Sequence, residues 1–144
     1  MAVPSLFQRK LAAHVRVPVA TSSLIQVPWI LGLLPPGQRV GVITVSAGSL
    51  LRRIWRRLGC RRIRLWRDQG GGLEFFRVLI WGESEDMDVA LAAHPDVEAI
   101  VLECTNMPPY AHALRAALRV PVFDVYSLVA RLHAGLWPRD FGVG

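Results

Sequence analysis

The sequence has few cysteines and no long apolar run, and each shortage excludes a class of protein. Two cysteines in 144 residues are too few for a disulfide-stapled scaffold and lack the spacing of a zinc site. No stretch reaches the ~18 uninterrupted apolar residues of a membrane span, and the N-terminus lacks the apolar core of a signal peptide. We therefore expect a cytoplasmic protein without a membrane partner, and a length that suits one ordinary domain.

The net charge of +6 comes from one segment. Eight of the 17 basic residues lie between Arg52 and Arg67, where there is no acid, and the rest of the chain is slightly acidic. With Trp55 and Trp66 nearby, this segment offers the phosphate contacts and stacking side chains of a nucleic-acid binder. No known binding module surrounds it, so a nucleic-acid partner is the weaker interpretation and a solvated basic face the simpler one.

The rest of the chain alternates between apolar runs and amphipathic periodicity. This alternation predicts an α/β protein with a parallel sheet flanked by helices. The expected strands are Val17–Ala20, Arg39–Val45, Glu98–Glu103 and Val120–Phe123. The expected helices are Ser5–Val15, one capped at Thr21–Ser23 and running to Leu34, Pro108–Leu118 and Val125–Gly135.

Polar residues follow three of the expected strands. These clusters are Thr21-Ser22-Ser23, Thr44-Val45-Ser46 and Cys104-Thr105-Asn106. Ligands of parallel sheets bind beyond the carboxyl ends of the strands. Each cluster alone suits helix capping, but the three together favour a binding site at this edge.

Four stretches carry a resemblance to a known family. Ala99–Tyr110 (AIVLECTNMPPY), followed by Val120–Tyr126 (VPVFDVY), resembles the second half-site of the aspartate/glutamate/hydantoin racemase superfamily. Leu6–Val27 and Gly41–Leu50 resemble the sequence that precedes this half-site in the superfamily. The resemblance implies a remnant of the first racemase-like half over residues 1–34, the second α/β half over 35–124, and a C-terminal helix and tail over 125–144.

The activity that the resemblance implies is cofactor-independent racemisation, an isomerase reaction at the α-carbon of an amino acid or small carboxylate. Cys104 is the implied catalytic thiol, because donors beyond a strand end stabilise a thiolate. Thr105, Asn106, Thr44 and Ser46 are the expected substrate-binding residues. No cofactor is implied, and the four histidines lack the spacing of metal ligands.

The chain also departs from the superfamily. Those racemases use two cysteines on opposite faces of the substrate, and the first would lie upstream of this sequence. Cys60 sits in residues 51–68, which match nothing in the superfamily and read either as a pair of frameshifts or as a real basic patch. We therefore expect no racemisation by this chain alone, and expect it to form a homo-oligomer or bind a complementing N-terminal half.

Three alternatives remain open. One is an arylmalonate decarboxylase-like enzyme, which keeps a single thiol of the same superfamily; the others are a non-catalytic remnant and the basic nucleic-acid binder. Glu103 precedes the thiol and, by strand alternation, should point to the opposite face. We expect it to pair with an arginine rather than to act as a base.

Overall fold

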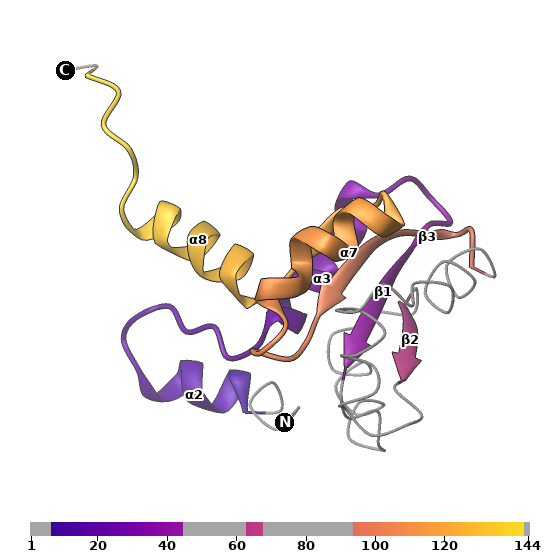
Figure 1. The fold of residues 1–144 in the computed structure, drawn as a ribbon. Coiled ribbons are helices and arrows are strands. Elements are labelled where there is room, and N and C mark those ends of the chain that lie inside the picture. The colour runs from indigo at the N-terminus through magenta and orange to yellow at the C-terminus, as the bar shows by residue number, and fades with distance from the viewer. Residues whose placement is uncertain (1–6, 45–62, 68–93, 143–144) are drawn as a thin grey trace.

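The computed structural model describes residues 7–44, 63–67 and 94–142, and its centre is a sheet of four parallel strands (Figure 1). The strand order is β2-β1-β3-β4. The strands are β1 (Arg39–Thr44), β2 (Ile63–Arg67), β3 (Val97–Leu102) and β4 (Val122–Phe123). The predicted α/β class with a parallel sheet is confirmed.

The central strands β1 and β3 form because their sequences suit burial on both faces. Every β1 residue after Arg39 is buried, and β3 is buried except at Glu98. Continuous β-branched and aliphatic runs of this kind are typical of parallel strands that are covered on both sides. Ile43 of β1 lies opposite Leu102 of β3, so the carboxyl ends of the two strands meet at one edge.

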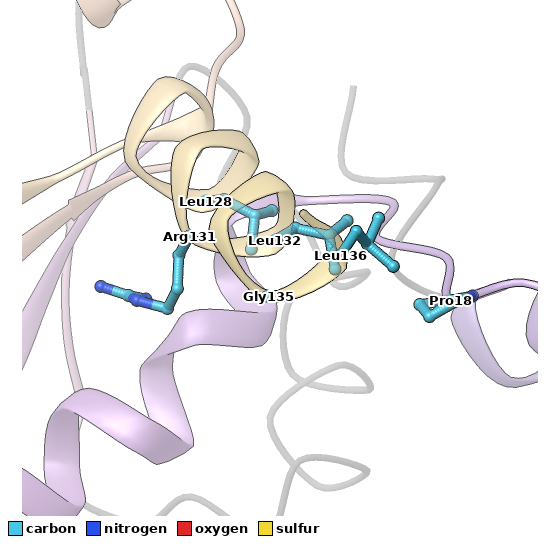
Figure 2. Close-up of a pocket in the computed structure, with 6 residues that line it drawn as sticks. All are labelled: Pro18, Leu128, Arg131, Leu132, Gly135 and Leu136. Atoms are coloured by element: carbon cyan, nitrogen blue, oxygen red, sulfur yellow. The ribbon is translucent and has the colours of Figure 1, made fainter. Parts of the chain in front are cut away.

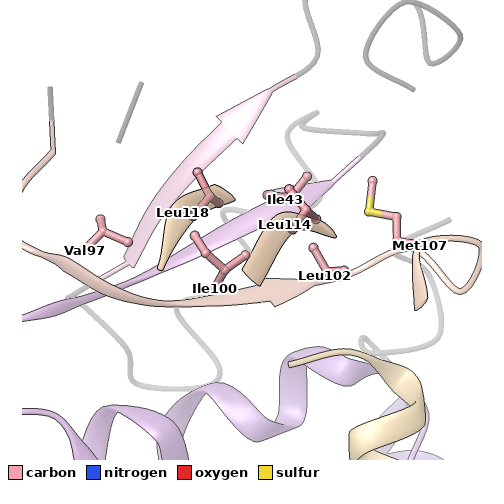
Figure 3. Packing of buried hydrophobic residues seen from close by; sticks show 7 residues of the cluster. All are labelled: Ile43, Val97, Ile100, Leu102, Met107, Leu114 and Leu118. Carbon is pink, nitrogen blue, oxygen red and sulfur yellow. The ribbon is translucent and has the colours of Figure 1, made fainter. Parts of the chain in front are cut away.

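Helix α7 (Ala111–Leu118) covers one face of the sheet. Its Leu114 and Leu118 are buried against β1 and β3 (Figure 3). The cluster consists of Ile43, Val97, Ile100, Leu102, Met107, Leu114 and Leu118. Because side chains alternate along a strand, Ala99 and Val101 of β3 face the other layer.

The other layer consists of the 3₁₀ turn η1 (Ser23–Gln26), helix α3 (Val27–Leu33) and helix α8 (Val125–Leu136). Helix α3 contacts β1, η1 contacts β3, and α8 contacts β4. Pro35 and Pro36 follow α3, and Gly37 takes a positive φ of 93° that favours glycine. The predicted end of this helix is thus confirmed.

Helix α2 (Gln8–His14) confirms the first predicted helix but buries none of its residues. Its link to the rest of the chain is the Gln8 side chain. The amide Nε2 donates to the Val19 carbonyl at 2.6 Å, and Oε1 accepts from the Thr21 N–H at 3.0 Å and hydroxyl at 2.8 Å. The prediction of a strand at Val17–Ala20 is wrong, since the Gln8 side chain occupies the Val19 carbonyl and Pro18 has no N–H to donate.

The remaining predictions differ from the structure mainly at the ends of elements. The strand expected at Val120–Phe123 is limited to the two residues of β4, and the helix expected from Pro108 begins as the 3₁₀ turn η2 (Pro108–Tyr110) before α7. Strand β2 was missed, because it lies in the arginine-rich segment. It pairs with β1 from Val40 opposite Ile63 to Thr44 opposite Arg67.

Among the described residues, no helix combines the length and the apolar character that crossing a bilayer requires. This agrees with the absence of a long apolar run in the sequence.

Candidate functional site

The carboxyl ends of β1 and β3 are joined by one backbone and one side-chain hydrogen bond. The Glu103 N–H donates to the Ile43 carbonyl at 3.0 Å. The Thr44 hydroxyl donates to Oε2 of Glu103 at 3.0 Å, and both residues are buried. The pairing of Ile43 with Leu102 places Thr44 and Glu103 at this shared edge, beside the predicted thiol.

Cys104 follows Glu103 at the point where the chain leaves β3. Its thiol is free and half-buried, and the side chain packs against the cluster under α7. The Met107 N–H donates to the Cys104 carbonyl at 3.1 Å, which closes a tight turn through Thr105 and Asn106. Both of these residues are exposed.

The helix that follows the thiol does not present its first N–H groups directly to it. The turn η2 separates Cys104 from α7, and its first two residues, Pro108 and Pro109, have no N–H. The donors nearest in sequence are therefore the backbone N–H groups and side chains of Thr105 and Asn106. In the part of the chain that the structure describes, neither residue takes part in a hydrogen bond, so these donors are available to a ligand.

The turn η1 is fixed across the same edge by side-chain hydrogen bonds. The Ser23 hydroxyl donates to the Leu102 carbonyl at 2.6 Å, in a buried contact between residues 79 positions apart. Gln26 Nε2 donates to the Asp124 carbonyl at 2.9 Å, just beyond β4. The Ser22 hydroxyl caps η1 by accepting from the Leu24 N–H. This polar cluster thus holds the edge in place.

Helix α8 begins at this edge with a capping box. The Asp124 carboxylate accepts from the Ser127 N–H at 2.7 Å, and the Ser127 hydroxyl accepts from the Asp124 N–H at 2.9 Å. Further along α8, Arg131 donates to Gln26 Oε1 at 2.8 Å and stacks over the Trp29 ring at 3.7 Å from the ring centre. Helix α8 is therefore connected to η1 by a hydrogen bond and to α3 by a cation–π contact.

The structure thus brings four of the five predicted site residues to one edge: Cys104, Thr105, Asn106 and Thr44. Ser46 and Cys60 lie outside the described residues. The predicted roles of these side chains in catalysis and substrate binding stay predictions.

The sequence did not reveal that Glu103 helps to join the carboxyl ends of β1 and β3. The predicted orientation of Glu103, opposite to Cys104, agrees with its contact to Thr44. Among the described side chains, the Glu103 carboxylate is bonded to the Thr44 hydroxyl, and the expected pairing with an arginine stays a prediction. Thr44 and Glu103 are polar residues at the ends of two predicted strands, and this was the available signal. Predicting their contact from it requires the strand register.

A pocket of about 360 Å³ lies elsewhere, beside α8 (Figure 2). No predicted site residue lines it. Leu132 and Leu136 on α8 face Pro18 from the segment after α2, and the Arg131 side chain lies at the other end. Its remaining lining residues are Leu128 and Gly135. Within the described ranges, no group of three or more His, Cys, Asp or Glu side chains is arranged to hold a metal ion.

The fold resembles that of a racemase of known structure. The structure resembles the crystal structure of allantoin racemase from Pseudomonas fluorescens, with a TM-score of 0.55 and 16% sequence identity. The match covers 78% of this chain and 50% of the racemase chain. The resemblance to the racemase superfamily is therefore confirmed for the fold, and no family model matches the sequence.

The curated relatives in sequence are lyases. Dimethylsulfoniopropionate lyase 5 of Emiliania huxleyi (strain CCMP1516) is 29% identical over 136 residues, covering 82% of this chain and 27% of the lyase. Dimethylsulfoniopropionate lyase 3 of the same strain is 31% identical over 159 residues, covering 88% of this chain and 38% of the lyase. The dimethylsulfoniopropionate lyase of Durusdinium sp. clade D is 24% identical, with 82% and 44% covered.

These relatives contradict the racemase function expected from the sequence, since they point to a lyase. The chain spans between 27% and 44% of the length of these three proteins. The motif around Cys104 predicted the fold but not the reaction, and the isomerase assignment is withdrawn.

Proposed function

We propose that this chain carries the thiol site of a lyase that eliminates dimethyl sulfide from dimethylsulfoniopropionate. The observation that carries the proposal is the match to curated lyases of this substrate over 82% to 88% of the chain. The position of Cys104 supports it, because the free thiol lies at the edge where ligands of parallel sheets bind.

The proposed reaction is a β-elimination. The Cys104 thiolate removes a proton from the carbon next to the carboxylate. The electrons of that C–H bond form the new carbon–carbon double bond, while the electrons of the C–S bond leave with sulfur. The products are acrylate, neutral dimethyl sulfide and the protonated thiol.

An elimination needs one base, whereas racemisation needs a base on one face and an acid on the other. The sulfonium group leaves as a neutral molecule and requires no proton. One thiol is therefore enough for the proton transfer, and Cys104 is the free cysteine within the described ranges.

The negative charge that develops as the α-proton leaves spreads onto the substrate carboxylate. Thr105 and Asn106 are the proposed donors to that carboxylate, since both are exposed beside the thiol and free of other bonds in the described structure. Fixed donors that meet a developing charge lower the barrier more than donors that must first reorganise. Thr44 and Ser46 complete the proposed set of binding residues.

The test supplies the purified chain with dimethylsulfoniopropionate and measures dimethyl sulfide in the headspace by gas chromatography. We expect release by the wild type and a loss of roughly 10²–10⁴-fold in Cys104→Ser, the usual contribution of a general base. The matched control is Cys60→Ser, which should retain activity. Absence of release by the wild type, or an equal rate in Cys104→Ser, would overturn the proposal.

A further inference from the structure

The pocket beside α8 is lined by an apolar stripe that the domain covers only in part. Leu128, Leu132 and Leu136 are spaced by four residues, so they lie on one face of the helix. Leu128 is 8% exposed, whereas Leu136 is 57% exposed. Pro18 lies opposite the far end of the stripe (Figure 2). The three leucines extend over about 12 Å of helix, and they give the pocket one long apolar wall.

Gly135 leaves open space in the same wall. The residue lies inside α8 and its φ is not positive, so the backbone does not require a glycine there. Glycine destabilises a helix relative to alanine. A Cβ at Gly135 would have no neighbouring side chain or packed backbone within 4 Å, and the residue lines the pocket. The glycine therefore adds volume to the pocket rather than a turn to the chain.

The charges around the pocket favour an anionic ligand. Neither residues 7–38, which include Pro18, nor helix α8 contains an aspartate or a glutamate. Arg131 lies at the end of the pocket away from Pro18 (Figure 2), and among the described lining residues it is the charged one. Its guanidinium donates to the Gln26 amide oxygen at 2.8 Å and stacks over Trp29 at 3.7 Å, and neither contact cancels its positive charge. An anion is therefore attracted to this end, whereas a cation, or a second copy that carries the same charges, is repelled.

We propose that this pocket binds a medium-chain carboxylate from solution, with the carboxylate at Arg131 and the hydrocarbon chain along Leu132 and Leu136. The planar guanidinium suits the two oxygens of a carboxylate, and the leucines cover the chain. The volume of about 360 Å³ is within the range of roughly 300–1,000 Å³ that is typical of small-molecule sites. This site is separate from the edge that carries Cys104 and goes beyond the proposed lyase reaction.

The experiment measures binding of octanoate to the purified full chain by isothermal titration calorimetry, below the concentration at which octanoate forms micelles. Octanol is the uncharged ligand with the same number of carbons, and hexanoate is the shorter carboxylate. We expect octanoate to bind roughly tenfold or more tightly than octanol, because hydrogen bonds to charged groups are strong. Hexanoate should bind roughly tenfold more weakly than octanoate, because it buries less hydrocarbon.

Two variants test the two ends of the pocket. Gly135→Leu fills the open space and should weaken octanoate roughly tenfold or more, without lowering the thermal stability, since leucine favours a helix more than glycine does. The matched control is Gly32→Leu in α3, where a Cβ also has nothing within 4 Å and which does not line the pocket. Arg131→Met should bring the affinities for octanoate and octanol close to each other by weakening octanoate alone. Arg139→Met, in the C-terminal tail, should leave both affinities unchanged.

Absence of octanoate binding, or equal affinities for octanoate and octanol in the wild type, would overturn the proposal. Wild-type affinity in Gly135→Leu, or an equal loss in Gly32→Leu, would place the ligand outside this pocket and overturn it as well. Sedimentation of the same samples tests a second copy as the occupant, and cosedimentation with phosphatidylserine vesicles tests a bilayer. A wild-type dimer or a vesicle complex that Gly135→Leu abolishes counts against the proposal. If Gly135→Leu loses its circular dichroism spectrum, Arg131→Met decides, and a wild-type preference for octanoate there refutes the proposal.

Discussion

The sheet and helix α2 are stabilised to very different degrees. Strands β1 and β3 are buried and are clamped at both ends, by Arg39 with Asp96 at one edge and by Thr44 with Glu103 at the other. Helix α2 buries no residue and is attached through the Gln8 side chain. This difference indicates that the sheet and its covering helices form a self-supporting unit. Contacts with this unit stabilise α2 only a little.

The outer surface also exposes large apolar side chains. These are Phe7, Leu11, Val15, Val17, Trp29, Leu33, Tyr126, Val129, Leu136, Trp137 and Phe141. Apolar surface of this extent is usually covered by a partner or by another domain. The expectation of a homo-oligomer or a complementing half agrees with this surface and stays a prediction.

The largest effect is expected in the core of the sheet. Ile100 of β3 is fully buried between β1, β4 and α7. Ile100→Ala should lower the free energy of unfolding by about 2–5 kcal/mol, because it removes buried methyl and methylene groups and leaves a cavity. Urea titration followed by circular dichroism measures the change. A loss under about 1 kcal/mol would mean that the sheet is not the stable region.

A smaller effect is expected where η1 joins the sheet. Ser23→Ala removes the hydroxyl that donates to the Leu102 carbonyl at 2.6 Å, in a contact shielded from water. The expected loss is about 1–2 kcal/mol, since a buried acceptor loses a hydrogen bond that water cannot replace. The same urea titration measures it. Stability equal to that of the wild type would show that η1 does not depend on this contact.

A still smaller effect on stability is expected where α8 contacts η1 and α3. Arg131→Met keeps most of the aliphatic stem but loses the hydrogen bond to Gln26 and the stacking over Trp29. The expected loss is about 1 kcal/mol, because exposed cation–π contacts contribute ~0.5–1 kcal/mol. Arg139→Met is the matched control, since Arg139 contacts Phe141 in the exposed C-terminal tail. Equal losses in the two variants would remove the distinction between α8 and the tail.

The sequence predicted the buried strands because their composition is unambiguous. Arg39–Thr44 and Val97–Leu102 are largely continuous apolar runs, and such runs directly indicate burial on both faces. Strand β2 was missed because its sequence, IRLWR, alternates with arginine in a basic segment, and its pairing with β1 is a long-range contact. Local propensity predicts such strands poorly, since the neighbouring strand decides them.

The candidate site was likewise predictable only where the local sequence decides the structure. The cluster Cys104-Thr105-Asn106 was predicted because it directly follows a buried strand. The contact between Thr44 and Glu103 joins residues 59 positions apart and depends on the strand register, which the sequence does not reveal. The reaction was predicted wrongly, because the proposed lyase and a racemase share the removal of an α-proton. The fate of the resulting carbanion depends on the leaving group of the substrate, which a motif around the thiol does not encode.

The smallest effect on the free energy of unfolding is expected for substitutions in α2. Leu11 is 44% exposed, and its helix contributes nothing to the core. Leu11→Ala should change the free energy of unfolding by less than about 0.5 kcal/mol, because alanine favours a helix slightly more than leucine does and little buried area is lost.

Gln8→Ala, in contrast, removes the three hydrogen bonds to Val19 and Thr21. It should speed hydrogen exchange in residues 8–21 without changing exchange in β1 and β3, as expected for a region that opens locally. If Leu11→Ala costs more than about 1 kcal/mol, or if the two regions exchange together in Gln8→Ala, then α2 belongs to the same cooperative unit as the sheet. Its exposed side chains would then already be covered in solution, and sedimentation of the wild type would show whether a second copy covers them.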